Sequence, residues 1–455
     1  MNEELTDTPR GSESDATVTP PAEEQTGRDI CSAEPQPVKI SEQSIPQPQV
    51  AFKSPSAKAA PRRTLRSLVR RFKGYAISIG FGIIIAAMMI ASIVIVPSLR
   101  VFFSERMTAN GLGMFMVYWI AGMVILVAVM YAQIIIHEGG HLVCGLASGY
   151  RFVSFRVASL ILYRDGSRLR FGRFSIAGTA GQCLLEPPTG RIEDADRMPL
   201  GAYFMGGAAA NLTIAAAAAA LLATGIQNTA AAFTASMFLF TGIVTAAMNG
   251  LPIRVGGMPN DGLNARMMRR DIEIRRMLWI QLTVNAQYSR GRLLRDMPDE
   301  WFAIPQGADL ANHMYTSVAL FDVWRQIERR DFAAADDLLL RLRLREGHMI
   351  ELYRLETAVD RMFVAVMLQR PLQSIRNIFT DRVRAYVTAD ARYNISHALE
   401  LYAWERFVEG DAERAADRAE TIRRALPHHH AGGEATDCAE LLAWMETLPD
   451  NYLCN

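Results

Sequence analysis

The chain has few cysteines and almost no net charge. These two features argue against a disulfide-stabilised secreted domain and against a nucleic-acid-binding protein. Its five cysteines are scattered over 455 residues and odd in number. They make no disulfide framework, which suits a cell interior and membrane rather than a secreted domain. The formal net charge is only +1, so no basic excess indicates a nucleic-acid partner. Apolar residues make up 50% of the chain and are concentrated in long runs, as in a polytopic membrane protein.

Residues 1 to about 60 almost lack aromatic side chains and are rich in Pro, Ser, Thr and acidic residues. Such a segment cannot bury enough apolar surface to offset its chain entropy, so we expect a disordered tail. The first long apolar run follows only at about residue 75. It begins too late and runs too long to be the apolar core of a signal peptide.

Four apolar runs predict membrane-spanning helices, because each is long enough to cross the hydrocarbon layer. They cover about residues 75–97, 112–147, 203–224 and 231–249. Basic residues crowd positions 62–73, before the first run, and return at positions 266–276, after the fourth. Basic residues mark the cytoplasmic ends of spans. We therefore expect an integral protein of a bacterial plasma membrane with both termini in the cytoplasm.

Residues 151–178, between the second and third runs, alternate polar and apolar side chains around Asp165-Gly166, which predicts a β-hairpin. From about residue 271 the chain is soluble in character and has a helical pattern. We therefore expect a mainly α fold. A membrane-embedded helical bundle with a small β insert would occupy residues 61–270, and a soluble all-α, repeat-like domain would occupy residues 271–455.

A faint repeat with a period of 40 residues runs through the C-terminal part, at residues 330–335, 370–375 and 410–415. The pattern looks like a tetratricopeptide-type array, which would present a surface for a protein partner. An irregular helical bundle explains it equally well, so both interpretations stay open. His428, His429 and His430 form a tract that can bind metal adventitiously but is more typical of a solvated loop.

The motif His137-Glu138-Gly139-Gly140-His141 ends the second apolar run, which carries no charge from residue 113 to residue 136. Ionisable groups at membrane depth are costly and usually functional. Helix positions four residues apart share a face, so both histidines can offer a ring nitrogen to one Zn²⁺. Glu138, one residue further round, can reach a water on the metal and serve as the general base.

A catalytic zinc commonly takes three protein ligands and keeps a fourth position for water. No histidine other than His137 and His141 occurs before His313, so we expect an acidic third ligand. Asp261 is the best candidate, because it stands just beyond the fourth run, on the same membrane side as the motif. Cys144 is the competitor, since it shares the helical face of the histidines. A free cysteine in an apolar helix is more often a core residue.

The motifs resemble those of the site-2 protease family of zinc intramembrane metalloproteases, over roughly residues 112–270. The shared elements in chain order are His137-Glu138-x-x-His141, a glycine-rich stretch ending in Asn211, and Asn249-x-x-Pro252 before Asp261-Gly262. The resemblance implies a set of site residues: the zinc ligands His137, His141 and Asp261, the general base Glu138, and Asn211 and Asn249 as candidate supports of the site or the substrate. An interhelical hydrogen bond explains Asn211 equally well.

The function predicted in this way is a zinc-dependent intramembrane endopeptidase that cleaves a membrane-spanning or membrane-associated protein. Two alternatives stay open: processing of a secreted peptide precursor, and an inactive membrane scaffold that recruits partners through its helical domain. An intact Glu138 favours an enzyme, because a binding-only protein needs no buried base. Gly139 and Gly140 either let a substrate approach the zinc or permit close helix packing.

Overall fold

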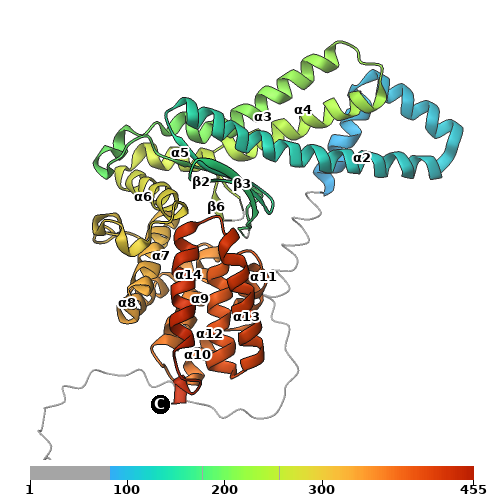
Figure 1. Ribbon diagram of the computed structural model, residues 1–455. Helices are drawn as coiled ribbons and strands as arrows, with labels where there is room; N and C mark the ends of the chain where they lie inside the picture. The colour runs from blue at the N-terminus through green and yellow to red at the C-terminus, as the bar shows by residue number, and fades with distance from the viewer. Residues whose placement is uncertain (1–81, 177, 256, 455) are drawn as a thin grey trace, which may run out of the picture. The chain divides into compact units, whose positions relative to one another are not determined.

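The computed structural model describes residues 82–176, 178–255 and 257–454 (Figure 1). The tail expected at residues 1–60, the basic cluster at residues 62–73 and the start of the first expected span lie outside the described residues. Helices dominate the described chain, and a small sheet interrupts them. The prediction of a mainly α fold with a small β insert is therefore confirmed.

Among the described residues, three helices are long and apolar enough to cross a membrane: Gly113–Ala147 within α2 (Pro97–Ala147), α3 (Leu200–Ala223) and α4 (Thr229–Gly250). A further helix, Gly82–Ile95, meets the start of α2 at an angle of 98°, and counting this bent pair as one span raises the number to four. Pro97 occupies the first turn of α2, where its missing N–H leaves no helical hydrogen bond unmade. Helices of this length and composition indicate a membrane-associated chain.

The outer faces of these helices carry large apolar side chains that no other part of the described chain covers. Val124 and Val143 of α2 are 64% and 67% exposed, and Leu212 of α3 is 56% exposed. A large apolar surface is unfavourable in water but is well solvated by lipid chains. The inner faces of α2 and α4 pack around a small core that includes Leu126 and Met237. This division of faces is the one expected of a membrane bundle.

Small residues bring α2 and α3 into backbone contact beside the histidine motif. A Cβ added to Gly140 would lie 2.2 Å from the carbonyl oxygen of Gly206, and a Cβ added to Gly206 would lie 2.5 Å from that of Gly140. Glycine at both positions permits this crossing, as small residues do in membrane helix pairs. Nothing lies within 4 Å of the Cβ position of Gly139. Of the two roles considered for the glycine pair, close packing therefore applies to Gly140.

A four-stranded antiparallel sheet separates α2 from α3 along the chain, in the strand order β3-β2-β1-β4. Its strands are β1 (Arg151–Val157), β2 (Leu160–Asp165), β3 (Arg168–Arg173) and β4 (Gly181–Glu186). The predicted hairpin is confirmed at β2–β3, where Asp165 pairs with Arg168 and Gly166 takes the positive φ that a tight turn requires. β4 pairs with the other side of β1 and is an outer strand of the sheet.

A two-stranded ribbon and a short helix follow α4 and bring the chain back to the histidine motif. β5 (Arg254–Val255) pairs with β6 (Met258–Pro259), and α5 (Asp261–Arg270) begins two residues later. α6 (Ile272–Ser289) continues from α5. A buried core that includes Met268 and Trp279 joins α5 and α6 to β4 and to the start of α3.

The C-terminal part is an all-α array with a buried core of its own, drawn in orange and red in Figure 1. Its helices are α7 (His313–Glu328), α8 (Phe332–Arg343), α9 (Glu351–Met367), α10 (Leu372–Ile378), α11 (Asp381–Asp390), α12 (Ile395–Ala403), α13 (Ala412–Ala425) and α14 (Gly432–Glu446). Short 3₁₀ segments cover Ile192–Arg197, Leu294–Asp296, Asp299–Trp301, Glu346–His348, Leu426–His428 and Tyr452–Cys454, and a π-helical turn covers Trp404–Glu409.

The three positions of the sequence repeat fall at three similar turns between helices. Arg330, Gln369 and Gly410 each adopt a left-handed conformation, with φ values of +61°, +53° and +68°. Such a residue after a helix lets the following N–H groups satisfy the last carbonyl groups of that helix. The repeat thus coincides with three helix pairs, α7–α8, α9–α10 and α12–α13. Membership of a tetratricopeptide-type array stays a prediction.

Candidate metal centre

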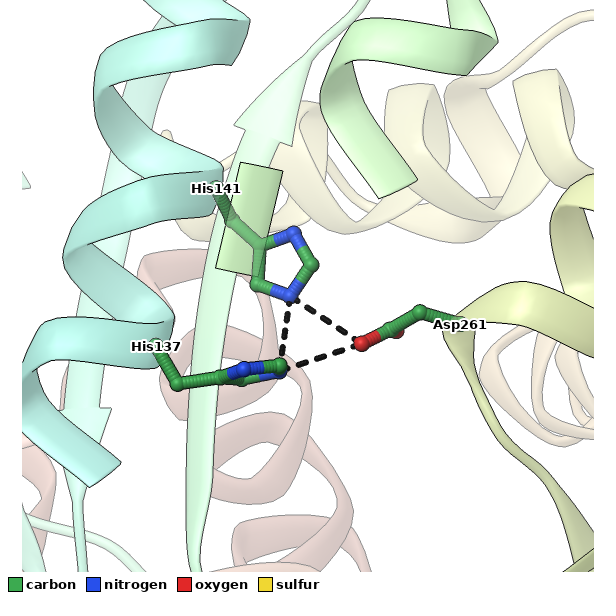
Figure 2. Close-up of side chains that lie close together, drawn as sticks. All are labelled: His137, His141 and Asp261. Atoms are coloured by element: carbon green, nitrogen blue, oxygen red, sulfur yellow. Dashed lines mark hydrogen bonds and ion pairs between the residues drawn. The ribbon is translucent and has the colours of Figure 1, made fainter. Parts of the chain in front are cut away.

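Three metal-ligating atoms from two distant segments meet at the end of α2 (Figure 2). His137 Nε2 lies 3.1 Å from His141 Nε2 and 3.1 Å from Asp261 Oδ2, and His141 Nε2 lies 3.3 Å from the same carboxylate oxygen. Within the described part of the chain, this is the one cluster of three histidine, cysteine or acidic side chains compact enough to hold a metal ion. The structure therefore brings together the three residues that sequence reasoning selected as ligands.

The triangle of ligand atoms fits a tetrahedral Zn²⁺. Zinc bonds of about 2.0–2.1 Å at tetrahedral angles place neighbouring ligand atoms roughly 3.3 Å apart. The three observed separations, between 3.1 and 3.3 Å, are close to this value. Two nitrogen lone pairs and a carboxylate oxygen repel one another at such distances, and a cation between them removes this repulsion. The donor set of two imidazoles and one carboxylate also suits a catalytic zinc, which leaves one position open.

Hydrogen bonds to the far side of each ring determine which nitrogen faces the metal position. His141 Nδ1 donates to the carbonyl oxygen of Tyr203 at 2.6 Å, because a carbonyl can only accept. His137 Nδ1 lies 2.8 Å from Asn211 Oδ1, and Asn211 Nδ2 donates to the carbonyl oxygen of Gln133 at 3.0 Å. Both rings thus carry their proton on Nδ1 and present an Nε2 lone pair, as metal-bound histidines do.

Asn260 positions Asp261, the third candidate ligand, and the sequence analysis did not identify this role. Its Oδ1 accepts from the N–H of Leu263, which caps the start of α5. Its Nδ2 donates to the carbonyl oxygens of Met248 at 2.6 Å and Leu251 at 2.5 Å. One side chain therefore ties the first turn of α5 to the end of α4 and holds Asp261 at the metal position. An asparagine directly before a helical Asp-Gly pair is a recognisable N-cap signal that could have identified it.

The electrostatics of Asp261 favour the charged form that a metal requires. Burial raises the pKa of Asp261, but the neighbouring His137 and His141 outweigh burial and lower its pKa to about 2. Asp261 is therefore a carboxylate at neutral pH. It also lies in the first turn of α5, where the helix dipole favours negative charge.

Glu138 stands beside the start of β4. It is 9% exposed, and a Cβ added to Gly181 would lie 2.4 Å from its Oε1. Glycine at position 181 therefore leaves the space that this carboxylate fills. Arg156 is fully buried and donates to the carbonyl oxygens of Ala158 at 2.7 Å and Gly181 at 3.3 Å. Arg156 thereby holds the backbone next to Glu138, and an arginine in an alternating strand had given no signal of this role.

A cavity of about 580 Å³ is lined by the three candidate ligands and Glu138. One wall is residues 178–183, at the start of outer strand β4, and another is the β6 and α5 junction. Asn249 also lines the cavity, and its Nδ2 donates to the carbonyl oxygen of Thr245 in its own helix at 3.0 Å. Cys144 lies against α3, 2.9 Å from the Cβ position of Gly206, and is outside the ligand cluster. The cavity is large enough for a peptide segment next to the metal position.

No protein-family model matches the chain, and no curated protein or solved structure does. The resemblance to site-2 proteases therefore stays a prediction from short motifs.

Proposed function

We propose that the protein is a zinc-dependent endopeptidase that acts in the membrane on a membrane-spanning or membrane-associated protein. One observation carries the proposal: His137 Nε2, His141 Nε2 and Asp261 Oδ2 converge within 3.1–3.3 Å, beside a buried glutamate and a cavity. A zinc hydrolase needs these parts at its centre.

His137, His141 and Asp261 would hold the metal beside the cavity. When bound, zinc supplies a Lewis acid that polarises the scissile carbonyl and makes a water acidic enough to attack it. Glu138 takes the proton of the attacking water and delivers it to the departing amine, so the peptide bond breaks with no net change in protons on the enzyme. The burial of Glu138 keeps bulk water away from this transfer.

The substrate segment would lie extended along the start of β4. β4 is an outer strand, so its outward backbone N–H and C=O groups can pair with an added strand. The backbone of a helical span is hydrogen-bonded to itself, and such a segment must unwind before it can pair in this way. The enzyme would therefore select substrates whose spans unwind easily near the cleavage point.

The membrane setting is proposed from the three apolar helices and from the basic residues that flank them. In this setting the protein is integral to a bacterial plasma membrane, both termini are cytoplasmic, and the motif lies near the inner end of its span. The C-terminal helices would then offer a cytoplasmic surface to a protein partner.

A Glu138→Gln variant tests the enzymatic proposal directly. The purified protein in detergent, loaded with zinc, is incubated with fluorescently labelled, denatured casein. We expect cleavage by the wild type and a rate about 10²- to 10⁴-fold lower for the variant, because general-base catalysis contributes about that much. Zinc content should be the same in both proteins. A variant that cleaves as fast as the wild type, or a zinc-loaded wild type that does not cleave, contradicts the proposal.

The substrate class is tested by comparing membrane peptides from cells that produce the wild type or Glu138→Gln. We expect fragments with new termini inside apolar spans in the wild type alone. New termini confined to secreted peptides would instead support the alternative of precursor processing. Identical peptide sets would favour the scaffold.

A further inference from the structure

A polar side chain lies in the apolar interior of α2, one turn before the first ligand. Gln133 is 1% exposed. Its Nε2 donates to the carbonyl oxygen of Phe238 at 3.0 Å and to Thr241 Oγ1 at 3.3 Å, both on α4. Its Oε1 accepts from Asn211 Nδ2 on α3 at 2.6 Å. Burying an amide among apolar helices is costly unless its hydrogen bonds are made, and here donor and acceptor ends are both occupied.

The directions of these hydrogen bonds follow from two fixed points, the carbonyl oxygen of Phe238 and the main-chain carbonyl oxygen of Gln133, which accepts from Asn211 Nδ2 at 3.0 Å. The carbonyl oxygen of Phe238 can only accept, so the Gln133 amide must turn its NH₂ toward α4 and its oxygen toward Asn211. Asn211 must then turn its NH₂ toward Gln133 and its oxygen toward His137. His137 must in turn donate from Nδ1, which leaves the Nε2 lone pair for the metal.

We propose that Gln133 is a positioning residue that, through Asn211, sets the tautomer and ring orientation of His137 and thereby the affinity of the site for Zn²⁺. The inference rests on the proposed zinc site and adds a residue from outside the motif to it. An Asn211 amide turned by 180° would present NH₂ to His137 Nδ1. The ring proton would then move to Nε2, where it blocks the metal.

Gly242 of α4 shows how closely the three helices approach around this chain of hydrogen bonds. A Cβ added to Gly242 would lie 3.0 Å from Gln133 Nε2, from the carbonyl oxygen of Asn211 and from the Cβ of Ala215. Glycine thus lets α4 come near enough for the Phe238 carbonyl to reach Gln133. Asn211 is fully buried, so no water competes for its amide.

The alternative is that Gln133 only joins helices, as buried amides in membrane proteins do. Zinc affinity separates the two roles. We expect Gln133→Met, which keeps the length and packing of the side chain, to weaken zinc binding by about 3- to 10-fold, the equivalent of one buried hydrogen bond. Asn211→Leu, which removes the direct partner of His137, should weaken it by about 10- to 100-fold. In the Asn211→Leu background, Gln133→Met should have little further effect, since Gln133 acts through Asn211.

The measurement is a zinc titration of the purified, metal-stripped protein in detergent against a chelator of known affinity. Ser236→Ala is the matched control, because Ser236 is also fully buried in a span but donates only to Phe233 of its own helix among the described contacts. Thermal melting of the metal-free proteins is recorded in parallel. A Gln133→Met protein that melts earlier but binds zinc as tightly as Ser236→Ala has lost only a helix contact, and the proposal is then wrong.

Nitrogen-15 NMR of histidine-labelled, metal-free protein reads the tautomer itself, with His137→Ala identifying the signal. We expect the Nδ1-protonated form in the wild type. In Gln133→Met, where the main-chain carbonyl of residue 133 alone still orients Asn211, we expect a measurable share of the Nε2-protonated form. An unchanged tautomer contradicts the proposal. A wild type that binds no zinc overturns both this inference and the proposed function, whereas a wild type that binds zinc without cleaving peptides overturns only the protease.

Discussion

Gly207 of α3 determines how near the two histidine rings can stand to that helix. A Cβ added to it would lie 2.5 Å from His137 Cε1 and 2.6 Å from His141 Nε2. Real side chains do not approach so closely, so any larger residue would displace a ligand. Glycine at position 207 therefore leaves the space that the two imidazole rings occupy, and their hydrogen bonds then hold them there.

Two substitutions, Asp261→Ala and Cys144→Ala, test which of the two candidate residues is the third ligand. We expect Asp261→Ala to abolish proteolysis and to weaken zinc binding by more than about 100-fold, because a direct ligand outweighs the outer-shell effects of about 10- to 100-fold. Cys144→Ala should leave both nearly intact, since Cys144 lies outside the cluster. Metal analysis and casein cleavage decide. If Cys144→Ala loses the metal and Asp261→Ala retains it, the ligand set is wrong.

Individual residues of the site differ in how far the sequence predicts them. His137 and His141 could be predicted because helical periodicity alone puts them on one face. Asp261 could be predicted because few other acids were available near the inner ends of the runs. Gln133 and Gly207 could not be predicted, since their roles arise only where α2, α3 and α4 come together. In the sequence, the only sign of such a close contact between helices is a polar or a small residue within an apolar run.

At the scale of elements, the junction between α4 and α5 decides whether the metal centre is complete. After α4 ends, the short ribbon β5–β6 must bring the chain back so that Asp261 lies beside the histidines of α2. Two consecutive glycines, Gly256 and Gly257, would permit a flexible connection here. The structure has β5–β6 and the Asn260 hydrogen bonds on either side of that turn, and these hold Asp261 in place.

Replacing the cap at this junction should loosen the metal. We expect Asn260→Ala to destabilise the protein by about 1 kcal/mol, the usual effect of losing an N-cap, and to weaken zinc binding several-fold because Asp261 is then less well held. Asn312→Ala is the matched control, since Asn312 caps α7 in the same way. Both variants should melt earlier, and only the first should release zinc faster to a chelator. Equal zinc release from the two would contradict the role of Asn260.

Elements were also predicted unevenly. The hairpin β2–β3 could be predicted because alternation and Asp-Gly are local signals. β4 could not, since its residues Gly181–Glu186 do not alternate cleanly and the strand forms by pairing with distant β1. The 98° bend before Pro97 was not foreseen either, because a proline at the end of an apolar run is equally compatible with the end of a span.

At the scale of the whole molecule, zinc would connect α2 to α5 and so stabilise the membrane part as a unit. A ligand that binds only the folded state adds about 2.7 kcal/mol when its free concentration is 100 times its Kd. We expect one zinc per chain, a lower melting temperature after chelation, and recovery on adding zinc. His137→Ala should melt at the same temperature with or without zinc. A wild type whose melting ignores zinc would contradict a metal that links the two helices.

Asp261 follows His137 by 124 residues. During synthesis of the chain, the three-residue cluster therefore cannot form until well after His137 has been made. At a synthesis rate of roughly 5–20 residues per second, about 6–25 s pass between the emergence of the first ligand and the last. Two further apolar helices must be inserted and packed within or after that interval. Until then the growing chain carries the histidine motif but lacks its third ligand. If the chain is the proposed protease, this order of assembly would keep it inactive while its own spans, and those of neighbouring nascent proteins, are still unprotected.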